Sequence, residues 1–107
     1  MILRQWRALA HRNEALHYVE HLRTETFPAL KKMPGFIDAS ILSRAHSAGV
    51  EFVIETRWES LTAISSFAGV DTEAAVVPPK VAAMMIEFDN RARHFEVIES
   101  MSSASPP

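Results

Sequence analysis

The chain has 107 residues, of which 48% are hydrophobic and 22% charged, and its formal net charge is −2. This length corresponds to one globular domain, and the charge gives no support for a nucleic-acid or membrane-surface partner. Because the chain has no cysteine, disulfides, thiolate metal sites, iron–sulfur clusters and cysteine nucleophiles are excluded.

The first residues do not have the pattern of a secretory signal, because Arg4 and Arg7 interrupt the apolar run that such a signal needs. No apolar stretch approaches the roughly 20 residues that span a bilayer. We therefore expect a cytoplasmic protein with no membrane partner.

Bulky apolar and arginine side chains over residues 2–9 predict a first strand. Asn13 suits the N-cap of the helix that follows, and Pro28 should kink this helix or start a second short one. Pro34 and Gly35 form a stop signal for the helix.

Residues 36–44 and 51–58 predict the second and third strands, because both are rich in β-branched and aromatic side chains. Residues 46–49 between them resemble a hairpin loop. Ser60 then caps a second helix, and Gly69 suits the position just after its end.

The last third of the chain begins with a connector that ends at Pro78 and Pro79. Apolar residues at helical spacing predict a short helix over residues 80–88. A last strand is predicted over residues 93–99, which completes a domain of residues 1–99. Residues 100–107 are small and polar with two prolines, so we expect a disordered tail.

The predicted order of elements is β-α-β-β-α-β, which is the ferredoxin-like arrangement of the α+β class. Helices would cover one face of a four-stranded antiparallel sheet. Strands two and three carry apolar side chains on both faces. Strand two has Phe36 and Leu42 on one side with Ile37, Ala39 and Ile41 on the other, and strand three has Phe52 and Ile54 against Val53. We therefore expect an apolar helix-free face that a second copy covers in a homodimer.

Four sequence blocks, in this order, resemble the antibiotic biosynthesis monooxygenase-like group of the dimeric α+β barrel superfamily. They are Arg4-Gln-Trp-Arg7, residues 18–23 with 33–36, residues 58–69, and residues 93–97. The resemblance covers residues 1–99 and implies a dimeric α+β barrel. It leaves the activity open, since this superfamily includes cofactor-independent oxygenases, haem-degrading enzymes, isomerases, decyclising enzymes and proteins without known activity.

The sequence departs from the haem-degrading branch of this superfamily. That branch has a histidine ligand a short way beyond the second helix, whereas residues 71–80 here contain no histidine. The aromatic residue near the end of that helix would be Phe67 instead of tryptophan. The sequence therefore predicts no haem, and the resemblance implies no other cofactor.

His17-Tyr-Val-Glu-His21 matches the H-x-x-E-H pattern of one class of zinc peptidases. A helical wheel places both histidines away from the apolar stripe, on the solvent face. A peptidase would also need a third ligand and a walled cleft. We therefore predict no metal site.

His94 lies inside the apolar last strand and is the candidate catalytic residue. Imidazole can remove a phenolic or benzylic proton near neutral pH. The alternative is a histidine in the core or at an interface that forms a hydrogen bond with a neighbouring carbonyl group.

A candidate substrate pocket combines aromatic side chains with a cation. Trp6 and Trp58 would form an aromatic wall on strands one and three, with Arg4 beside Trp6 and with Phe67 and Met84 completing the pocket. The alternative for each of these apolar residues is ordinary core packing.

Two functions compete at this stage. The first is a monooxygenase without flavin, haem or metal, in which His94 deprotonates a polycyclic phenol and the resulting carbanion reduces dioxygen. Arg4 and Trp6 would steady the developing oxyanion. The second is a non-catalytic dimer that binds a small hydrophobic metabolite or serves as a stress-related accessory protein. A haem-degrading relative is the third and weakest alternative.

Overall fold

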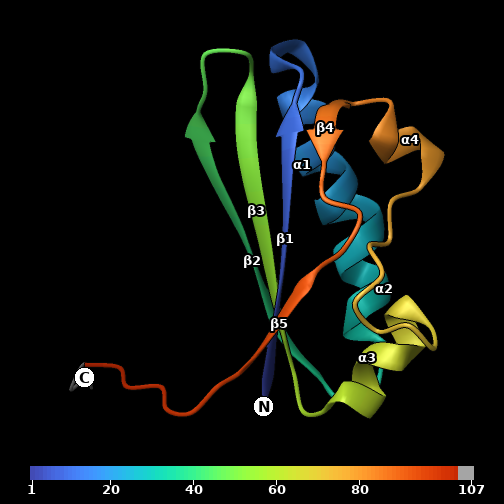
Figure 1. Ribbon diagram of the computed structural model, residues 1–107, viewed down its shortest axis with the longest axis vertical. Coiled ribbons are helices and arrows are strands. Elements are labelled where there is room, and N and C mark those ends of the chain that lie inside the picture. The colour runs from blue at the N-terminus through green and yellow to red at the C-terminus, as the bar shows by residue number, and fades with distance from the viewer. Residues whose placement is uncertain (104–107) are drawn as a thin grey trace.

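The computed structural model describes residues 1–103 of the chain (Figure 1). Its helices and strands are β1 (Ile2–Ala10), α1 (Ala15–His21), α2 (Phe27–Lys31), β2 (Phe36–Ala45), β3 (Val50–Trp58), α3 (Leu61–Ala68), α4 (Pro79–Ala82), β4 (Met85–Phe88) and β5 (Arg93–Glu96). Of the predicted disordered tail, residues 100–103 form no helix or strand, and residues 104–107 lie outside the described part of the chain.

The strands form one antiparallel sheet in the spatial order β2-β3-β1, and both β4 and β5 pair with the remaining edge of β1. β5 lies opposite residues 2–5 of β1, and β4 lies opposite residues 8–10. The two short strands therefore share the fourth position of the sheet. The predicted ferredoxin-like sheet is confirmed, with its last strand broken in two.

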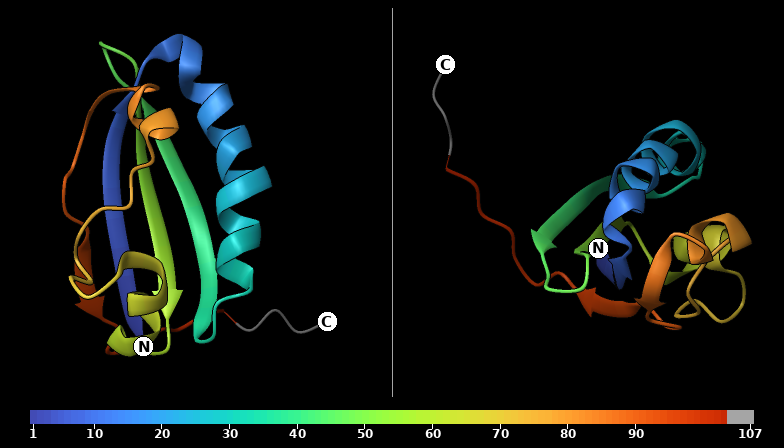
Figure 2. Two further views of the ribbon diagram at one scale, coloured as in Figure 1. Left: turned by 90° about the vertical axis from the view of Figure 1, so that its right-hand side faces the viewer. Right: turned by 90° about the horizontal axis from the view of Figure 1, so that it is seen from above.

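All helices lie on one face of the sheet, as both views of Figure 2 show. Strand alternation sends the large side chains Phe52, Ile54 and Trp58 of β3 to this face. Phe52 packs edge-on against Tyr18 of α1, with ring centroids 5.1 Å apart. A second cluster joins Trp58 to Leu30 and Ile64. Among the described residues, no helix has the length and apolar character needed to cross a bilayer.

The first helical stretch is continuous but not uniform. It opens with a 3-10 turn over Arg12–Glu14, so the predicted N-cap at Asn13 is wrong: Asn13 lies inside the turn. A π-helical segment, Leu22–Thr26, joins α1 to α2. Pro28 lies in the first turn of α2, where a missing N–H is tolerated, so the predicted start of a second short helix is confirmed.

The predicted helix over residues 80–88 is wrong. Only one turn, α4, forms there, and Met85–Phe88 continue as β4. β4 pairs with residues 8–10 of β1, whose backbone groups at this edge need partners. Tertiary pairing therefore overrides the helical spacing of the apolar residues. The last strand is also shorter than predicted, since β5 ends at Glu96.

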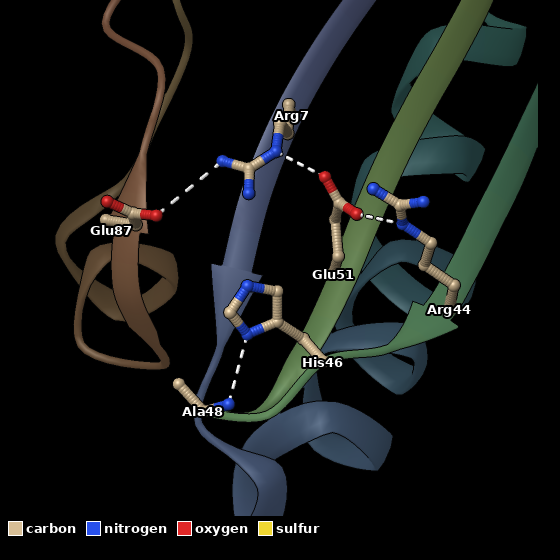
Figure 3. A network of polar contacts seen from close by, with 6 residues as sticks. All are labelled: Arg7, Arg44, His46, Ala48, Glu51 and Glu87. Atoms are coloured by element: carbon tan, nitrogen blue, oxygen red, sulfur yellow. Dashed lines mark hydrogen bonds and ion pairs between the residues drawn. The ribbon is translucent and has the colours of Figure 1, made fainter.

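The helix-free face of the sheet is mixed, so the prediction of an apolar face is wrong. Arg7 and Arg44 both bind the carboxylate of Glu51, and Arg7 Nη1 lies 3.8 Å from Glu87 Oε1 (Figure 3). The hydrogen bonds from Arg44 and from Arg7 lower the pKa of Glu51. Both strands have apolar residues at odd and even positions, but strand alternation in the observed register places most of the large ones under the helices.

Apolar side chains remain around this charged network. Leu42 is 44% exposed and Phe95 is 39% exposed, and Leu3 and Val53 are partly exposed on the same face.

The hairpin loop over residues 46–49 is confirmed, because the backbone groups of His46 and Gly49 bond to each other across it.

Two glycines allow a stability prediction. Gly35 and Gly69 both have φ of +84°, but a Cβ on Gly35 would lie 2.5 Å from Ala63 Cβ, whereas one on Gly69 would meet nothing within 4 Å. We expect Gly69→Ala to cost about 1–3 kcal/mol through backbone strain alone. Gly35→Ala should lower the free energy of unfolding by about 1–3 kcal/mol more than Gly69→Ala, because α3, which contains Ala63, must move. Urea unfolding followed by circular dichroism checks this, and equal losses in the two variants would contradict it.

Candidate functional site

A cleft of about 250 Å³ lies between the helices and the sheet. β1 and β3 form its floor, the stretch from α1 to α2 forms one wall, and α3 with residues 76–81 forms the other. Small-molecule sites in proteins hold about 300–1,000 Å³, so this cleft suits a compact ligand. Most of its lining is apolar, and the polar exceptions are Arg4, His21, Glu25, Thr26 and Thr56.

Arg4 is a buried cation on the floor of the cleft. Its side chain comes from β1, and the residue is 4% exposed. Its Nη2 donates to the carbonyl oxygen of Ala74 at 2.7 Å and its Nη1 to that of Thr72 at 3.4 Å. Burial lowers the pKa of Arg4, and the Glu73 carboxylate opposes this shift, but a guanidinium stays protonated in proteins.

No direct partner in the described part of the chain neutralises the charge of Arg4. It forms no ion pair with any carboxylate in residues 1–103. A buried cation that has only neutral carbonyl partners favours an anionic group nearby. The floor of the cleft can therefore stabilise a negatively charged oxygen of a ligand.

Aromatic side chains lie on two sides of the cleft. The indole Nε1 of Trp6 donates to the carbonyl oxygen of Asp89 at 2.7 Å, which fixes the ring. Phe67 of α3 lies 5.5 Å from the Arg4 guanidinium, measured from Cζ to the ring centroid. These rings give a planar ligand apolar contact beside a cation.

The structure brings together three of the predicted pocket residues, Arg4, Trp6 and Phe67. Trp58 does not line the cleft: it is fully buried, stacks on Phe67 with centroids 6.1 Å apart, and donates from Nε1 to Thr56 Oγ1 at 2.8 Å. Trp58 therefore supports the ring that lines the cleft. Met84 lies apart from the cleft, in the wall of a shallow depression beside it.

His94 does not line the cleft either, but it lies directly opposite Arg4 in the β1–β5 register. Its Nε2 is buried and has no hydrogen-bond partner among the described residues. Burial lowers the pKa of His94, and the neighbouring Arg4 charge lowers it further, whereas Glu73 and the Thr72 backbone raise it. His94 is therefore held neutral beside the arginine.

This shift of His94 predicts a pH dependence of stability. The pKa of His94 falls below its ordinary 6.5 in the folded chain, so below pH 6.5 the unfolded chain binds a proton that the folded chain does not. The free energy of unfolding should therefore fall as the pH drops below about 6.5. In His94→Gln this decline should be absent until carboxylates titrate at lower pH. Urea unfolding across pH checks this, and the exposed His17→Gln is the control.

His21 lies in the cleft wall, so the prediction that it sits on the solvent face is wrong. The residue is 8% exposed, and its Nδ1 lies 3.0 Å from Glu25 Oε2. Lys80 Nζ donates to the same oxygen at 2.8 Å. A helical wheel with one apolar stripe assumes that the helix is buried only where it faces the sheet. Here α4 covers a second side of the same helix, and His21 lies on that side.

His17 is exposed and pairs with Glu14 at 3.3 Å, in agreement with its predicted place on the solvent face. Within residues 1–103 no group of three or more histidine, aspartate or glutamate side chains could hold a metal ion.

Sequence reasoning missed His21 and Glu25 as site residues. Their i, i+4 spacing was a usable signal, because it places a carboxylate next to an imidazole on one helix face. The π-helical segment that contains Glu25 gave no signal, since nothing local predicts a widened turn. Lys80 could be assigned only from tertiary structure.

Comparison with known proteins gives matches among solved structures alone: no family model matches the sequence, and no curated protein does. A Bacillus cereus protein provisionally assigned as an antibiotic biosynthesis monooxygenase matches with a TM-score of 0.68 at 23% identity, covering 98% of both chains. The chain has the antibiotic biosynthesis monooxygenase fold. The resemblance seen in the sequence is confirmed at this level.

Two further structures with this fold were solved with ligands. ActVA-Orf6, a monooxygenase of Streptomyces coelicolor in complex with nanaomycin D, matches with a TM-score of 0.60 at 18% identity, covering 96% of this chain and 92% of that one. MhuD, a haem degrader of Mycobacterium tuberculosis with two haems in its active site, matches at 0.59 and 20% identity, covering 95% of this chain and 100% of that one. At such identities the likeness shows the fold and not the activity.

Proposed function

We propose that the chain is a monooxygenase that works without flavin, haem or metal on a small aromatic substrate of phenol-like or polyketide-like type. The observation that supports this most strongly is Arg4, a buried cation that has no carboxylate partner within residues 1–103 and faces a mostly apolar cleft. Such a site binds an aromatic ring and stabilises negative charge on its oxygen. That ActVA-Orf6 binds nanaomycin D on the same fold agrees with a ligand of this class.

The chemistry needs only the substrate and dioxygen. Loss of a proton gives an electron-rich anion, which reduces dioxygen and takes up one of its oxygen atoms. At a ring methylene the balance is two hydrogens lost and one carbonyl oxygen gained, while the second oxygen atom leaves as water. Arg4 stabilises the anion from which the electrons come.

His94 stays a prediction as the base of this reaction. Its Nε2, which has no hydrogen-bond partner among the described residues, and its lowered pKa suit a neutral proton acceptor. Because His94 lies opposite Arg4 but outside the cleft lining, a ligand that fills the cleft would not contact it in this arrangement.

Dioxygen uptake tests the proposed function. Purified, chelator-treated protein is given a panel of anthrone- and naphthol-type compounds, and oxygen consumption and products are measured together, with His94→Ala alongside. We expect one dioxygen consumed per product. If no compound is turned over and bound ligand is recovered unchanged, the chain is a binding module for small hydrophobic metabolites.

The size of the cleft does not fit haem. A cleft of about 250 Å³ is below the size of ordinary drug-sized sites, and a porphyrin needs more space than that. Residues 71–80 also contain no histidine to bind the iron. Haem titration should accordingly give no saturable shift of the Soret band at micromolar concentration.

We also propose that the helix-free face of the sheet is covered by a second copy of the chain. Leu42 and Phe95 are exposed there, while the charges of Arg7, Arg44 and Glu51 are paired within one protomer. A two-fold contact would bury the apolar side chains without leaving these charges unpaired.

Sedimentation tests this dimer. We expect a mass of about twice the 12.0 kDa of one chain, and a shift to the monomer in Leu42→Asp, because a carboxylate would be buried at the contact. Leu16→Asp is the matched control, since Leu16 is 83% exposed on α1 and lies away from this face. A monomeric wild-type chain at micromolar concentration would contradict the dimer.

A further inference from the structure

His21, Glu25 and Lys80 form a chain of polar contacts in and beside the cleft. His21 Nδ1 lies 3.0 Å from Glu25 Oε2, and Lys80 Nζ donates to the same oxygen at 2.8 Å. His21 and Glu25 both line the cleft, and His21 is 8% exposed. An imidazole that a carboxylate orients beside a ligand site is the arrangement of a general base.

The charge of Glu25 decides the tautomer of His21. The hydrogen bond from Lys80, and then that from His21, lower the pKa of Glu25, so its carboxylate is ionised and can only accept hydrogen bonds. Nδ1 of His21 must therefore carry the hydrogen that lies between them. In the neutral ring Nε2 then has the free lone pair, and it has no hydrogen-bond partner within residues 1–103.

The backbone places this pair at the cleft. His21 is the last residue of α1, and Glu25 belongs to the π-helical segment Leu22–Thr26 that forms part of the cleft wall. Segments of this kind are rare and occur often at functional sites. Arg4 lies on the floor of the same cleft, so a ligand there would have a cation from the sheet and an imidazole from the helix wall.

The other charged and titratable groups near His21 do not compete for this role. Burial raises the pKa of Tyr18, which stays neutral and can only donate its hydroxyl hydrogen or accept weakly. Arg4 and Lys80 are cations. Glu14, His17 and Glu20 share an adjoining depression with His21, Glu25 and Lys80 but do not line the cleft, and His17 pairs with Glu14 at 3.3 Å.

We infer that His21 is the proton acceptor for the hydroxyl of a phenolic ligand in the cleft, with Glu25 and Lys80 as positioning residues. The phenolic O–H bond breaks, a bond between this hydrogen and Nε2 forms, and the electron pair stays on the oxygen beside Arg4. The resulting imidazolium is stabilised by the Glu25 carboxylate. This inference rests on the proposed function, because it assigns the base of the same site to His21 instead of His94.

Nitrogen NMR with 4-nitrophenol as the probe tests the proton transfer without requiring turnover. In ¹⁵N-histidine-labelled protein, we expect the His21 Nε2 resonance to move to the protonated position when the probe binds, while visible absorbance shows bound phenolate. Glu25→Gln should move phenolate formation to higher pH, because the imidazolium loses its counter-charge. An Nε2 that stays unprotonated, or a probe that does not bind, would overturn the inference.

Kinetics separate this inference from the proposed function. With a compound that is turned over, we expect His21→Gln to lower kcat by about 100-fold or more, which is the usual contribution of a general base, with little change in KM. His17→Gln is the matched control, since His17 pairs with Glu14 in the same way but is exposed. Full activity in His21→Gln with loss in His94→Ala would overturn the inference and keep the proposed function. Proton transfer to His21 without any dioxygen uptake would support His21 as the proton acceptor and contradict the proposed monooxygenase function.

Discussion

Arg4→Met is expected to lower kcat for dioxygen uptake by about 100- to 1,000-fold, which is the usual effect of removing one donor to a developing oxyanion. Methionine keeps much of the apolar stem but has no charge and no N–H group. The negative charge of the substrate anion would then lie in a mostly apolar cleft without the guanidinium. Steady-state rates from an oxygen electrode, with thermal unfolding to confirm the fold, check this result.

Two further variants test whether the loss of rate comes from the charge of Arg4. Arg4→Lys keeps the charge and should retain more activity than Arg4→Met, although it cannot reproduce both bonds to the Thr72 and Ala74 carbonyls. Arg93→Met is the matched control, because Arg93 also lies over an aromatic ring, 4.9 Å from the centroid of Phe95, but is exposed and outside the cleft. Wild-type rates in Arg4→Met would contradict the role of Arg4.

Trp58→Ala is expected to lower the free energy of unfolding by about 3–5 kcal/mol, the usual cost of deleting a buried tryptophan side chain. The residue is fully buried and contacts Phe36 and Phe67, with ring centroids 5.3 Å and 6.1 Å away. The total free energy of unfolding of a domain of this size is only about 5–15 kcal/mol. The variant should therefore be close to unfolding at 37 °C, as measured by urea denaturation and circular dichroism.

Trp6→Ala provides the comparison for Trp58→Ala. Trp6 is only partly buried and lines the cleft. Compared with Trp58→Ala, Trp6→Ala should therefore lower the free energy of unfolding less and lower the affinity for a ligand more. Trp58→Phe should fall between wild type and Trp58→Ala, because it keeps a ring but loses the bond to Thr56 Oγ1. Equal losses of stability in Trp6→Ala and Trp58→Ala would contradict the assignment of Trp58 as the support of the cleft wall.

The order β1-α1-β2-β3-α3 could be predicted because most local signals in this part of the chain agreed with the tertiary structure. Ser60 accepts a hydrogen bond from the backbone N–H of Ala63 at 3.2 Å, and Gly69 closes the same helix with a positive φ. The hairpin at residues 46–49 and the short helix at Pro28 follow in the same way from turn and proline chemistry.

β4 could not be predicted, because its apolar residues fit a helix equally well. Met85 and Phe88 are three positions apart, and only the unpaired edge of β1 selects the extended form. The charged helix-free face was missed for a related reason. Counting apolar residues in a strand does not say which face each one takes until the register is known.

Part of the candidate site could be predicted from side-chain chemistry and from the family resemblance. Side-chain chemistry indicates Arg4 and Trp6 as a cation beside a ring, the resemblance indicates Phe67 as a second ring, and the structure brings all three to one cleft. His21 was missed because the second buried flank of its helix is made by α4, more than 50 residues further along the chain. No periodicity within the helix contains that information.

The binding of 1-naphthol tests the central claim most directly, by a crystal structure of the complex or by NMR contacts between ligand and protein. We predict that the ring lies in the cleft between Trp6 and Phe67, with its oxygen within hydrogen-bond distance of Arg4 and facing His21 Nε2. A naphthol found on the helix-free face beside Leu42 and Phe95, or no binding to the folded chain, would contradict the account.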